Sequence, residues 1–170
     1  MKVRAFALVA ACLLAISSPV AAQATERESL AGLDGLYVLV ENLNSEALEG
    51  GLTREALQTY LEMRLRQARI PILSEGEAVA NRRAPRVYLN VLASRPVPGL
   101  WVYKIGLYVM QRACIVGWPE GLAGGCFPSV TTWGLSTLHM TPEQRLPTPV
   151  REDVATLMDM LVNDYLAVNP

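Results

Sequence analysis

The feature that most constrains the fold is a long stretch in which apolar side chains alternate with other residues. Residues 100–116 read LWVYKIGLYVMQRACIV, and the apolar positions that share one parity are Trp101, Tyr103, Ile105, Leu107, Val109 and Ile115. A period of two is typical of a β-strand with one face on a hydrophobic core. Residues 127–140, FPSVTTWGLSTLHM, follow a Gly-rich segment and predict the antiparallel partner. The chain is therefore expected to be organised around one long hairpin.

Two cysteines, Cys114 and Cys126, flank the turn of this hairpin. If they face each other, the numbers of paired residues sum to 240, and Leu107 lies opposite Trp133. A slip of one residue would misplace the cysteines and the apolar side chains together, because side chains alternate between faces. A bulge at Pro128 would also change this register. The pattern predicts a structural disulfide between Cys114 and Cys126, which would stabilise the fold by roughly 3 kcal/mol.

Two other uses of the cysteines stay open on the sequence alone: free thiols, and a metal or redox site. A thioredoxin-like redox pair has the spacing C-x-x-C, whereas eleven residues separate Cys114 from Cys126. A zinc site needs four ligands, and the whole chain contains one histidine. We therefore expect no metal and no cofactor.

Helices and shorter strands complete the expected fold. Residues 53–69 carry an apolar stripe at helical spacing behind Thr53, a candidate N-cap, and residues 150–169 carry a second stripe. Further strands are expected at 35–43, 70–73 and 86–94. The order β-α-β-β-β-β-α predicts an α+β fold. We expect a two-layer sandwich, with a mixed or antiparallel sheet of about five strands and two amphipathic helices on one face.

The first 24 residues have the three-part layout of a bacterial secretory signal peptide. MKVR is a short basic head, AFALVAACLLAI is an apolar run of twelve residues, and SSPVAAQA ends in small residues. The apolar run is shorter than the roughly 20 residues that span a bilayer. Cleavage is expected after Ala24, with Ala22 as second choice, and residues 25–170 then form a single domain without a transmembrane segment. This mature chain is expected to be periplasmic or secreted.

Cys12 offers an alternative to soluble export. VAAC at 9–12 resembles the lipobox of bacterial lipoproteins, in which the cysteine becomes the lipidated first residue. The apolar run continues past Cys12, however, where a lipoprotein turns polar. Soluble export is therefore the first expectation, and lipidation of Cys12 is the second.

Charge excludes one class of partner. Removing Lys2 and Arg4 with the signal peptide leaves 13 basic and 16 acidic residues, a net charge of −3. Nucleic-acid binding calls for a clustered positive excess, so no nucleic-acid partner is expected.

Two segments are candidate binding surfaces. Seven arginines and two glutamates lie between positions 64 and 95, and arginine suits bidentate contact with phosphate or carboxylate. Arg82, Arg83 and Arg86 are therefore candidate contacts for an envelope protein or an anionic envelope component. A solvated face in an arginine-rich chain is the alternative. Trp118, in the turn GWPEG, is expected to be exposed, and aromatic residues are enriched in interfaces.

His139 is the only candidate for catalysis by an imidazole. Ser136 precedes it by three residues, and the acidic residues Glu143 and Asp153 follow. A Ser-His-Asp site is recognised by its geometry, and no G-x-S-x-G elbow is present in the sequence. We expect a surface or cross-strand role for His139, and a catalytic role only if the protein is an enzyme.

The layout resembles that of small domains of the bacterial cell envelope. The element order, with LTREALQTYLEMRLRQARIPIL at 52–73 as first helix and next strand, is similar to two such domains. They are the amino-terminal domain of the Tol-system propeller protein and the lipopolysaccharide-transport plug lipoprotein. FPSVTTWG and NDYLAVNP, later in the chain, resemble uncharacterised exported bacterial proteins. Neither resemblance brings a catalytic motif, so neither implies site residues.

These observations favour a non-catalytic role. We expect an exported accessory or binding protein that works with another component of the cell envelope. Two alternatives stay open: a small periplasmic hydrolase or redox enzyme that uses His139, and a lipid or glycan carrier with its ligand between sheet and helices.

Overall fold

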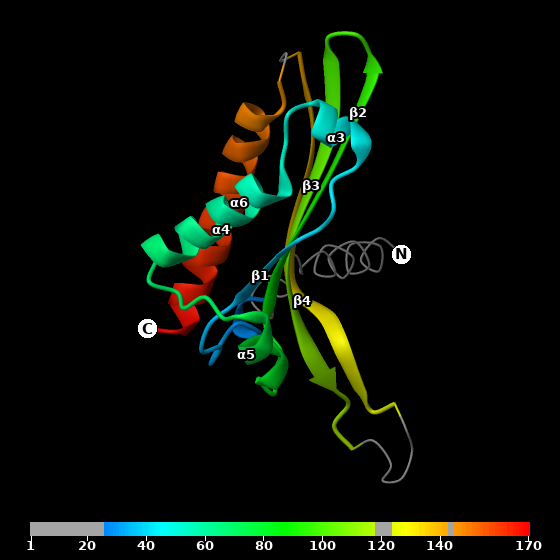
Figure 1. The fold of residues 1–170 in the computed structure, drawn as a ribbon. Coiled ribbons are helices and arrows are strands. Elements are labelled where there is room, and N and C mark those ends of the chain that lie inside the picture. Colours follow the sequence, from blue (N-terminus) through cyan, green and yellow to red (C-terminus); the bar gives the residue numbers. More distant parts are fainter. Residues whose placement is uncertain (1–25, 118–123, 143–144) are drawn as a thin grey trace, which may run out of the picture.

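The computed structural model of the chain describes residues 26–117, 124–142 and 145–170. It shows an α+β fold built on one four-stranded mixed sheet (Figure 1). In their order across the sheet, the strands are β1 (Tyr37–Val40), β2 (Arg86–Val97), β3 (Leu100–Cys114) and β4 (Cys126–Thr141). β1 runs parallel to β2, while β3 pairs antiparallel with both β2 and β4. The expected signal peptide, with Cys12, lies outside the described residues.

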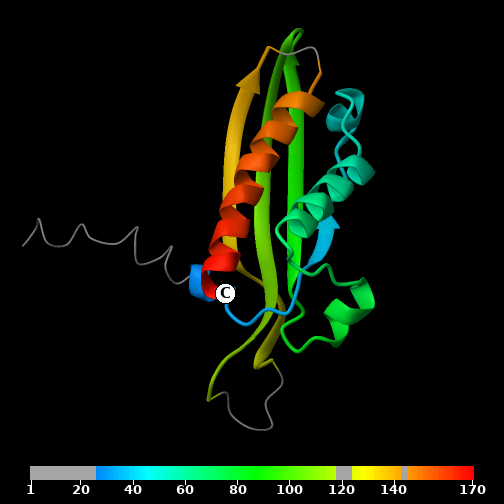
Figure 2. The same cartoon turned by 90° about the vertical axis from the view of Figure 1, so that its left-hand side faces the viewer.

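Two long helices, α4 (Arg54–Gln67) and α6 (Pro147–Val168), lie on the same side of the sheet (Figures 1 and 2). Thr53 caps α4 as expected, because its hydroxyl accepts a hydrogen bond from the Ala56 N–H at 3.2 Å. Two short helices, α3 (Ser45–Glu49) and α5 (Glu75–Ala80), lie in the connections on either side of α4. Within the described ranges, no helix combines the length and the apolar character needed to cross a membrane.

One continuous core fills the layer between the sheet and the helices. Each central strand contributes one parity of side chains, and each long helix contributes one stripe. The buried residues include Val87, Leu89 and Val91 of β2, Ile105, Leu107 and Val109 of β3, Leu57, Leu61 and Leu65 of α4, and Val150, Val154, Leu157 and Leu161 of α6. The alternating strands and the helical stripes thus contribute to the same cluster of buried residues.

The number of strands differs from the prediction. Residues 70–73 form no strand but only an isolated parallel bridge, between Leu36 and Ile72. Pro71 has no N–H to donate to a ladder, and its carbonyl accepts the Leu36 N–H at 2.9 Å. The described sheet therefore has four strands where the sequence predicted about five.

The hairpin of β3 and β4 lies where it was predicted, and Cys114 and Cys126 form the predicted disulfide. The prediction of one uniform register is wrong. The two cysteines face each other, as the sum of 240 requires, but Val109 rather than Leu107 lies opposite Trp133. The register therefore changes between the disulfide and the middle of the hairpin.

Two bulges in β4 cause this change. One lies within residues 127–130 and the other at Thr132, and each inserts one residue into β4. Together they shift the register by an even number, so Trp133 still points into the core. Thr132 is held from two sides: its hydroxyl accepts the side-chain N–H of buried Gln111 at 2.7 Å, and its carbonyl accepts the Ser29 hydroxyl at 3.0 Å.

The disulfide closes a short loop, and its removal is expected to destabilise the protein. Replacing both cysteines (C114S/C126S) should lower the free energy of unfolding by roughly 3 kcal/mol, mainly because the unfolded chain gains freedom. Urea unfolding followed by circular dichroism measures this change. Reduced wild type is the matched control and should unfold at the same urea concentration as the double variant. Equal stability of the oxidised and reduced proteins would contradict the prediction.

Candidate functional site

β4 is an edge strand that pairs with β3 alone, and α6 runs beside it on the covered side of the sheet (Figure 2). Trp133 is buried, with 2% of its surface exposed. Since side chains alternate along a strand, Leu135, Thr137 and His139 lie on the same face as Trp133. We refer to the surface between these four side chains and α6 as the β4–α6 slot.

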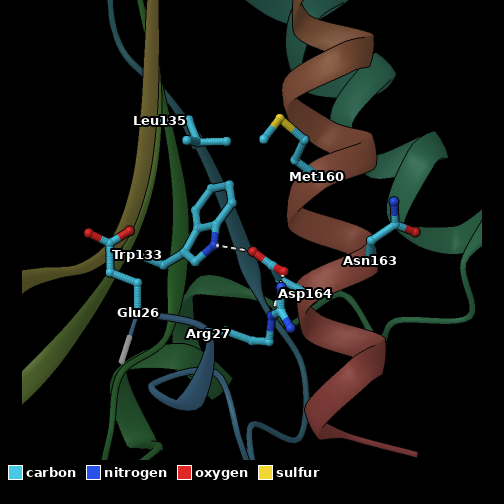
Figure 3. Close-up of a pocket in the computed structure, with 7 residues that line it drawn as sticks. All are labelled: Glu26, Arg27, Trp133, Leu135, Met160, Asn163 and Asp164. Atoms are coloured by element: carbon cyan, nitrogen blue, oxygen red, sulfur yellow. Dashed lines mark hydrogen bonds and ion pairs between the residues drawn. The ribbon is translucent and has the colours of Figure 1, made fainter. Parts of the chain in front are cut away.

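The slot opens into a hollow at the end where Trp133 lies (Figure 3). The hollow has a volume of about 260 Å³. Its lining comes from the N-terminal segment, β4 and α6, and consists of Glu26, Arg27, Trp133, Leu135, Met160, Asn163 and Asp164. Trp133, Leu135 and Met160 make much of this lining apolar, although it opens to solvent.

Asp164 holds the floor of the hollow together. The indole N–H of Trp133 donates to Asp164 Oδ2 at 3.0 Å, and Nε of Arg27 donates to Asp164 Oδ1 at 2.7 Å (Figure 3). One carboxylate therefore ties β4, α6 and the N-terminal segment to one another. Both of its oxygens are occupied, so we assign Asp164 a structural role at this site.

The other end of the slot contains His139, Asp153 and Tyr103. The Nδ1–H of His139 donates to Asp153 Oδ2 at 2.6 Å, and the Tyr103 hydroxyl donates to the same oxygen at 2.7 Å. The two rings are edge to face, with their centroids 5.9 Å apart. Burial of the Tyr103 hydroxyl, together with its hydrogen bond to the Asp153 carboxylate, raises the pKa of Tyr103 well above its ordinary range.

The His139–Asp153 pair has two members of a charge-relay site, but the candidate nucleophile lies elsewhere. A relay needs a hydroxyl or thiol beside the second ring nitrogen of the histidine. Ser136 has the opposite parity to His139, so its side chain lies on the other face of the sheet. Cys114 and Cys126 are joined to each other. The nucleophiles that the sequence offered are therefore not assembled with His139.

In the part of the chain that the structure describes, the edge of β4 from Trp133 to Met140 shows none of the usual protection against pairing with another chain. Residues 133–141 read WGLSTLHMT and include no proline and no Lys, Arg, Asp or Glu. Proteins commonly block exposed edges with such residues, or with bulges and covering segments. Both bulges of β4 and the contact from Ser29 lie before Trp133. Among the described residues, 133–140 of β4 are thus an unprotected edge beside a hollow of mixed polar and apolar lining.

The structure does not bring the predicted binding residues into this slot. Arg83 is used within the fold, since its guanidinium donates to the backbone carbonyls of Ala31, at 2.6 Å, and Ser29. Arg82 is exposed and Arg86 is half-buried in β2. Trp118 lies outside the described residues. A binding role for Arg82, Arg86 and Trp118 stays a prediction.

Several other arginines of the 64–95 segment also have partners within the fold. Arg64 pairs with Asp159, Arg66 pairs with Glu62 at 2.8 Å, and the Arg95 guanidinium lies 5.4 Å from the centroid of the Trp101 ring. Several arginines of this segment therefore make contacts within the protein itself.

Sequence reasoning missed Met160, Asp164 and Arg27. Met160 and Asp164 are four residues apart in α6, so they lie on one side of the helix next to the predicted apolar stripe. That spacing indicates that the two residues share one side of α6, but it does not indicate that β4 lies next to this side. Nothing local in the sequence connects Arg27 with a carboxylate 137 residues away.

Comparisons with known proteins found no match, whether to protein-family models, to curated proteins or to solved structures. Among the described residues, no three His, Cys, Asp or Glu side chains group closely enough to hold a metal ion. The chemistry of the slot itself therefore carries the functional argument.

Removing the Asp164 carboxylate is expected to destabilise the fold. In Asp164→Ala, the buried indole N–H of Trp133 loses its acceptor, which should lower the free energy of unfolding by about 1–3 kcal/mol. Asp159→Ala is the matched control, because Asp159 lies on the same helix with a side chain 59% exposed and pairs with Arg64 at the surface. That change should cost less than about 1 kcal/mol. Urea unfolding measures the free energy of unfolding of both variants. Equal losses of stability would contradict a structural role for Asp164 beyond that of a surface carboxylate.

The raised pKa of Tyr103 predicts a loss of stability in alkali. Above about pH 10, tyrosines ionise in the unfolded chain while Tyr103 stays protonated in the folded protein. The unfolded state then binds fewer protons, so the free energy of unfolding falls as the pH rises. Tyr103→Phe should make this fall shallower, and Tyr165, whose pKa is also raised by burial, should retain part of it. Urea unfolding at a series of pH values measures the slope, and an unchanged slope would refute this assignment.

Proposed function

We propose that the chain is an exported, non-catalytic binding protein of the bacterial cell envelope, and that a partner protein docks in the β4–α6 slot. The observation that carries the proposal is the edge at residues 133–140, unprotected among the described residues, beside the partly apolar hollow. A surface that combines free backbone groups with exposed apolar side chains suits a protein partner. The two-layer α+β sandwich expected from the sequence is part of this proposal, since it leaves one edge strand beside one helix.

Two features support export. Residues 1–24 combine a basic head, an apolar run and a small-residue end, which is the pattern of a signal peptide. The disulfide between Cys114 and Cys126 fits an oxidising compartment such as the periplasm. Lipidation at Cys12 is the alternative form of the same proposal, with the domain held at a membrane surface by its first residue.

A hydrolase or redox enzyme is the second candidate. It is favoured by one observation, the hydrogen-bonded His139–Asp153 pair with Tyr103 behind it. The position of Ser136 on the opposite face, and the pairing of the cysteines, leave this candidate without its expected nucleophile. The carrier alternative gains no support, because side chains fill the layer between sheet and helices in the part of the chain that the structure describes.

Site-specific crosslinking in the producing bacterium tests the proposal. A photo-crosslinking amino acid replaces either Met160, which lines the hollow, or Leu166, an equally exposed apolar residue on the same helix outside the hollow lining. We expect one defined protein adduct from position 160 in the periplasmic fraction, and none from position 166. A chain found only in the cytoplasm would contradict export.

Two further variants separate the alternatives in the same cells. If the protein is a binding protein, His139→Ala should leave the adduct from position 160 in place. If it is a hydrolase or redox enzyme that uses His139, the same substitution should abolish its catalytic activity. A crosslinker at Arg82 tests the arginine surface. An adduct from Arg82 without one from Met160 would show that the slot is the wrong surface.

A further inference from the structure

We infer that the occupant of the β4–α6 slot is an extended, apolar and basic segment of another protein, which pairs with the second half of β4 as an additional strand. The inference rests on the proposed function and specifies how the partner is recognised. Strand addition to a sheet edge is a general mode of peptide recognition, in which main-chain hydrogen bonds supply affinity and alternate side chains supply specificity.

The first argument is that, among the described residues, the other parts of the sheet edges have local protection. The opposite edge strand, β1, is only four residues long, and the residue before it bridges to Ile72. Beyond β1, the side chains of Asn44 and Glu46 bond to backbone groups of β2 at Ala93 and Arg95. The first half of β4 contains Pro128, two bulges and a hydrogen bond from Ser29 to Thr132. In the described part of the chain, residues 133–140 form a long and uncharged edge stretch whose strand neighbour is β3. This is the stretch against which a new strand can form a continuous ladder.

The second argument concerns the two faces of the added strand. On the helix side, its side chains would meet the hollow of about 260 Å³. This volume is below the range of about 300–1,000 Å³ that is usual for small-molecule sites, and it suits one or two side chains. On the other face, its side chains would lie beside Leu138 and Met140, which are 68% and 71% exposed. The outer face therefore favours apolar side chains, while the hollow suits a long side chain with an apolar stem and a polar end.

The third argument is charge complementarity. Three carboxylates lie along the slot, those of Glu26, Asp153 and Asp164. Among the described residues of the slot, Arg27 is the cation that accompanies them and is paired with Asp164, and His139 adds charge only when it is protonated. Basic side chains in the segment would be complementary to this excess. A second copy of the chain, paired edge to edge, would instead bring its own carboxylates against these, so the charges favour a different protein.

The test is a selection from a displayed library of random decapeptides on the mature, oxidised chain. Three forms are compared: wild type, Met160→Lys and Leu166→Lys. Met160 and Leu166 are 45% and 44% exposed on the same helix, so the two substitutions are matched in chemistry and exposure. Met160→Lys places a cation in the hollow and should repel a basic segment. Leu166→Lys adds the same charge outside the hollow lining.

We expect enriched peptides with alternating apolar residues and an excess of Lys and Arg over Asp and Glu. Their affinity should fall about tenfold or more in Met160→Lys and stay within about twofold of wild type in Leu166→Lys. Hydrogen exchange of the backbone amides of residues 133–141 should slow by about tenfold or more when an enriched peptide is bound, because outward-facing N–H groups gain acceptors.

Other outcomes would overturn the inference in distinct ways. Peptides that depend on Met160 but leave exchange in β4 unchanged would reject strand addition and leave the proposed binding function standing. Enriched acidic peptides would reject the charge argument. Amides of 133–141 that are already protected in a protein that sediments as a dimer would make a second copy the occupant. If no enriched peptide depends on Met160, the slot is not a binding site and the proposed function fails with it.

Discussion

The pairing of β3 with β4 decides which side chains of β4 face α6 and so form one wall of the β4–α6 slot. Two bulges in β4 together shift the register by an even number of residues, and this returns Trp133 to the core face. A single bulge would have turned Trp133 and His139 outward and directed Leu138 toward α6. The second bulge is held by the buried Gln111 amide and by the Ser29 hydroxyl, both of which bond to Thr132. The hydrogen bonds to Thr132 thus support the register that decides which residues of β4 belong to the candidate site.

A carboxylate near each end of α6 connects the helix to neighbouring elements. Near its start, Asp153 accepts hydrogen bonds from Tyr103 of β3 and His139 of β4. Near its end, Asp164 accepts from Trp133 of β4 and from Arg27. Each carboxylate therefore links the helix to the edge of the sheet. This arrangement gives the His139–Asp153 pair a structural reason to exist that requires no catalysis.

The sequence predicted those parts of the fold that depend on local periodicity. Alternation along residues 100–116 identified β3 and its buried face, and the positions of two cysteines identified the hairpin and its disulfide. The register was not predictable in the same way, because the bulge at Thr132 depends on Gln111 and on Ser29, which is 103 residues distant. The strand expected at 70–73 failed because Pro71 cannot donate to a ladder.

Prediction of the site was limited by partners distant in the sequence. His139 and Asp153 were both recognised as candidates, but Tyr103 was counted only as a core residue, although its hydroxyl reaches Asp153. Arg83, predicted as a binding residue from charge alone, has an intramolecular use that the sequence did not indicate, because its guanidinium donates to backbone carbonyls of the N-terminal segment. An arginine cluster in a sequence does not distinguish side chains that bind a partner from those that bind the chain's own carbonyl groups.

The disulfide has a consequence for the conformational freedom of the edge strand. β4 is joined to β3 by a covalent bond at one end, and just beyond its other end the Leu146 N–H donates to the Gly50 carbonyl ahead of α6. A strand held at both ends in this way keeps its extended conformation, so it has little conformational entropy to lose if it pairs with a further strand. The disulfide therefore fixes one end of an edge strand as well as closing the loop of a hairpin.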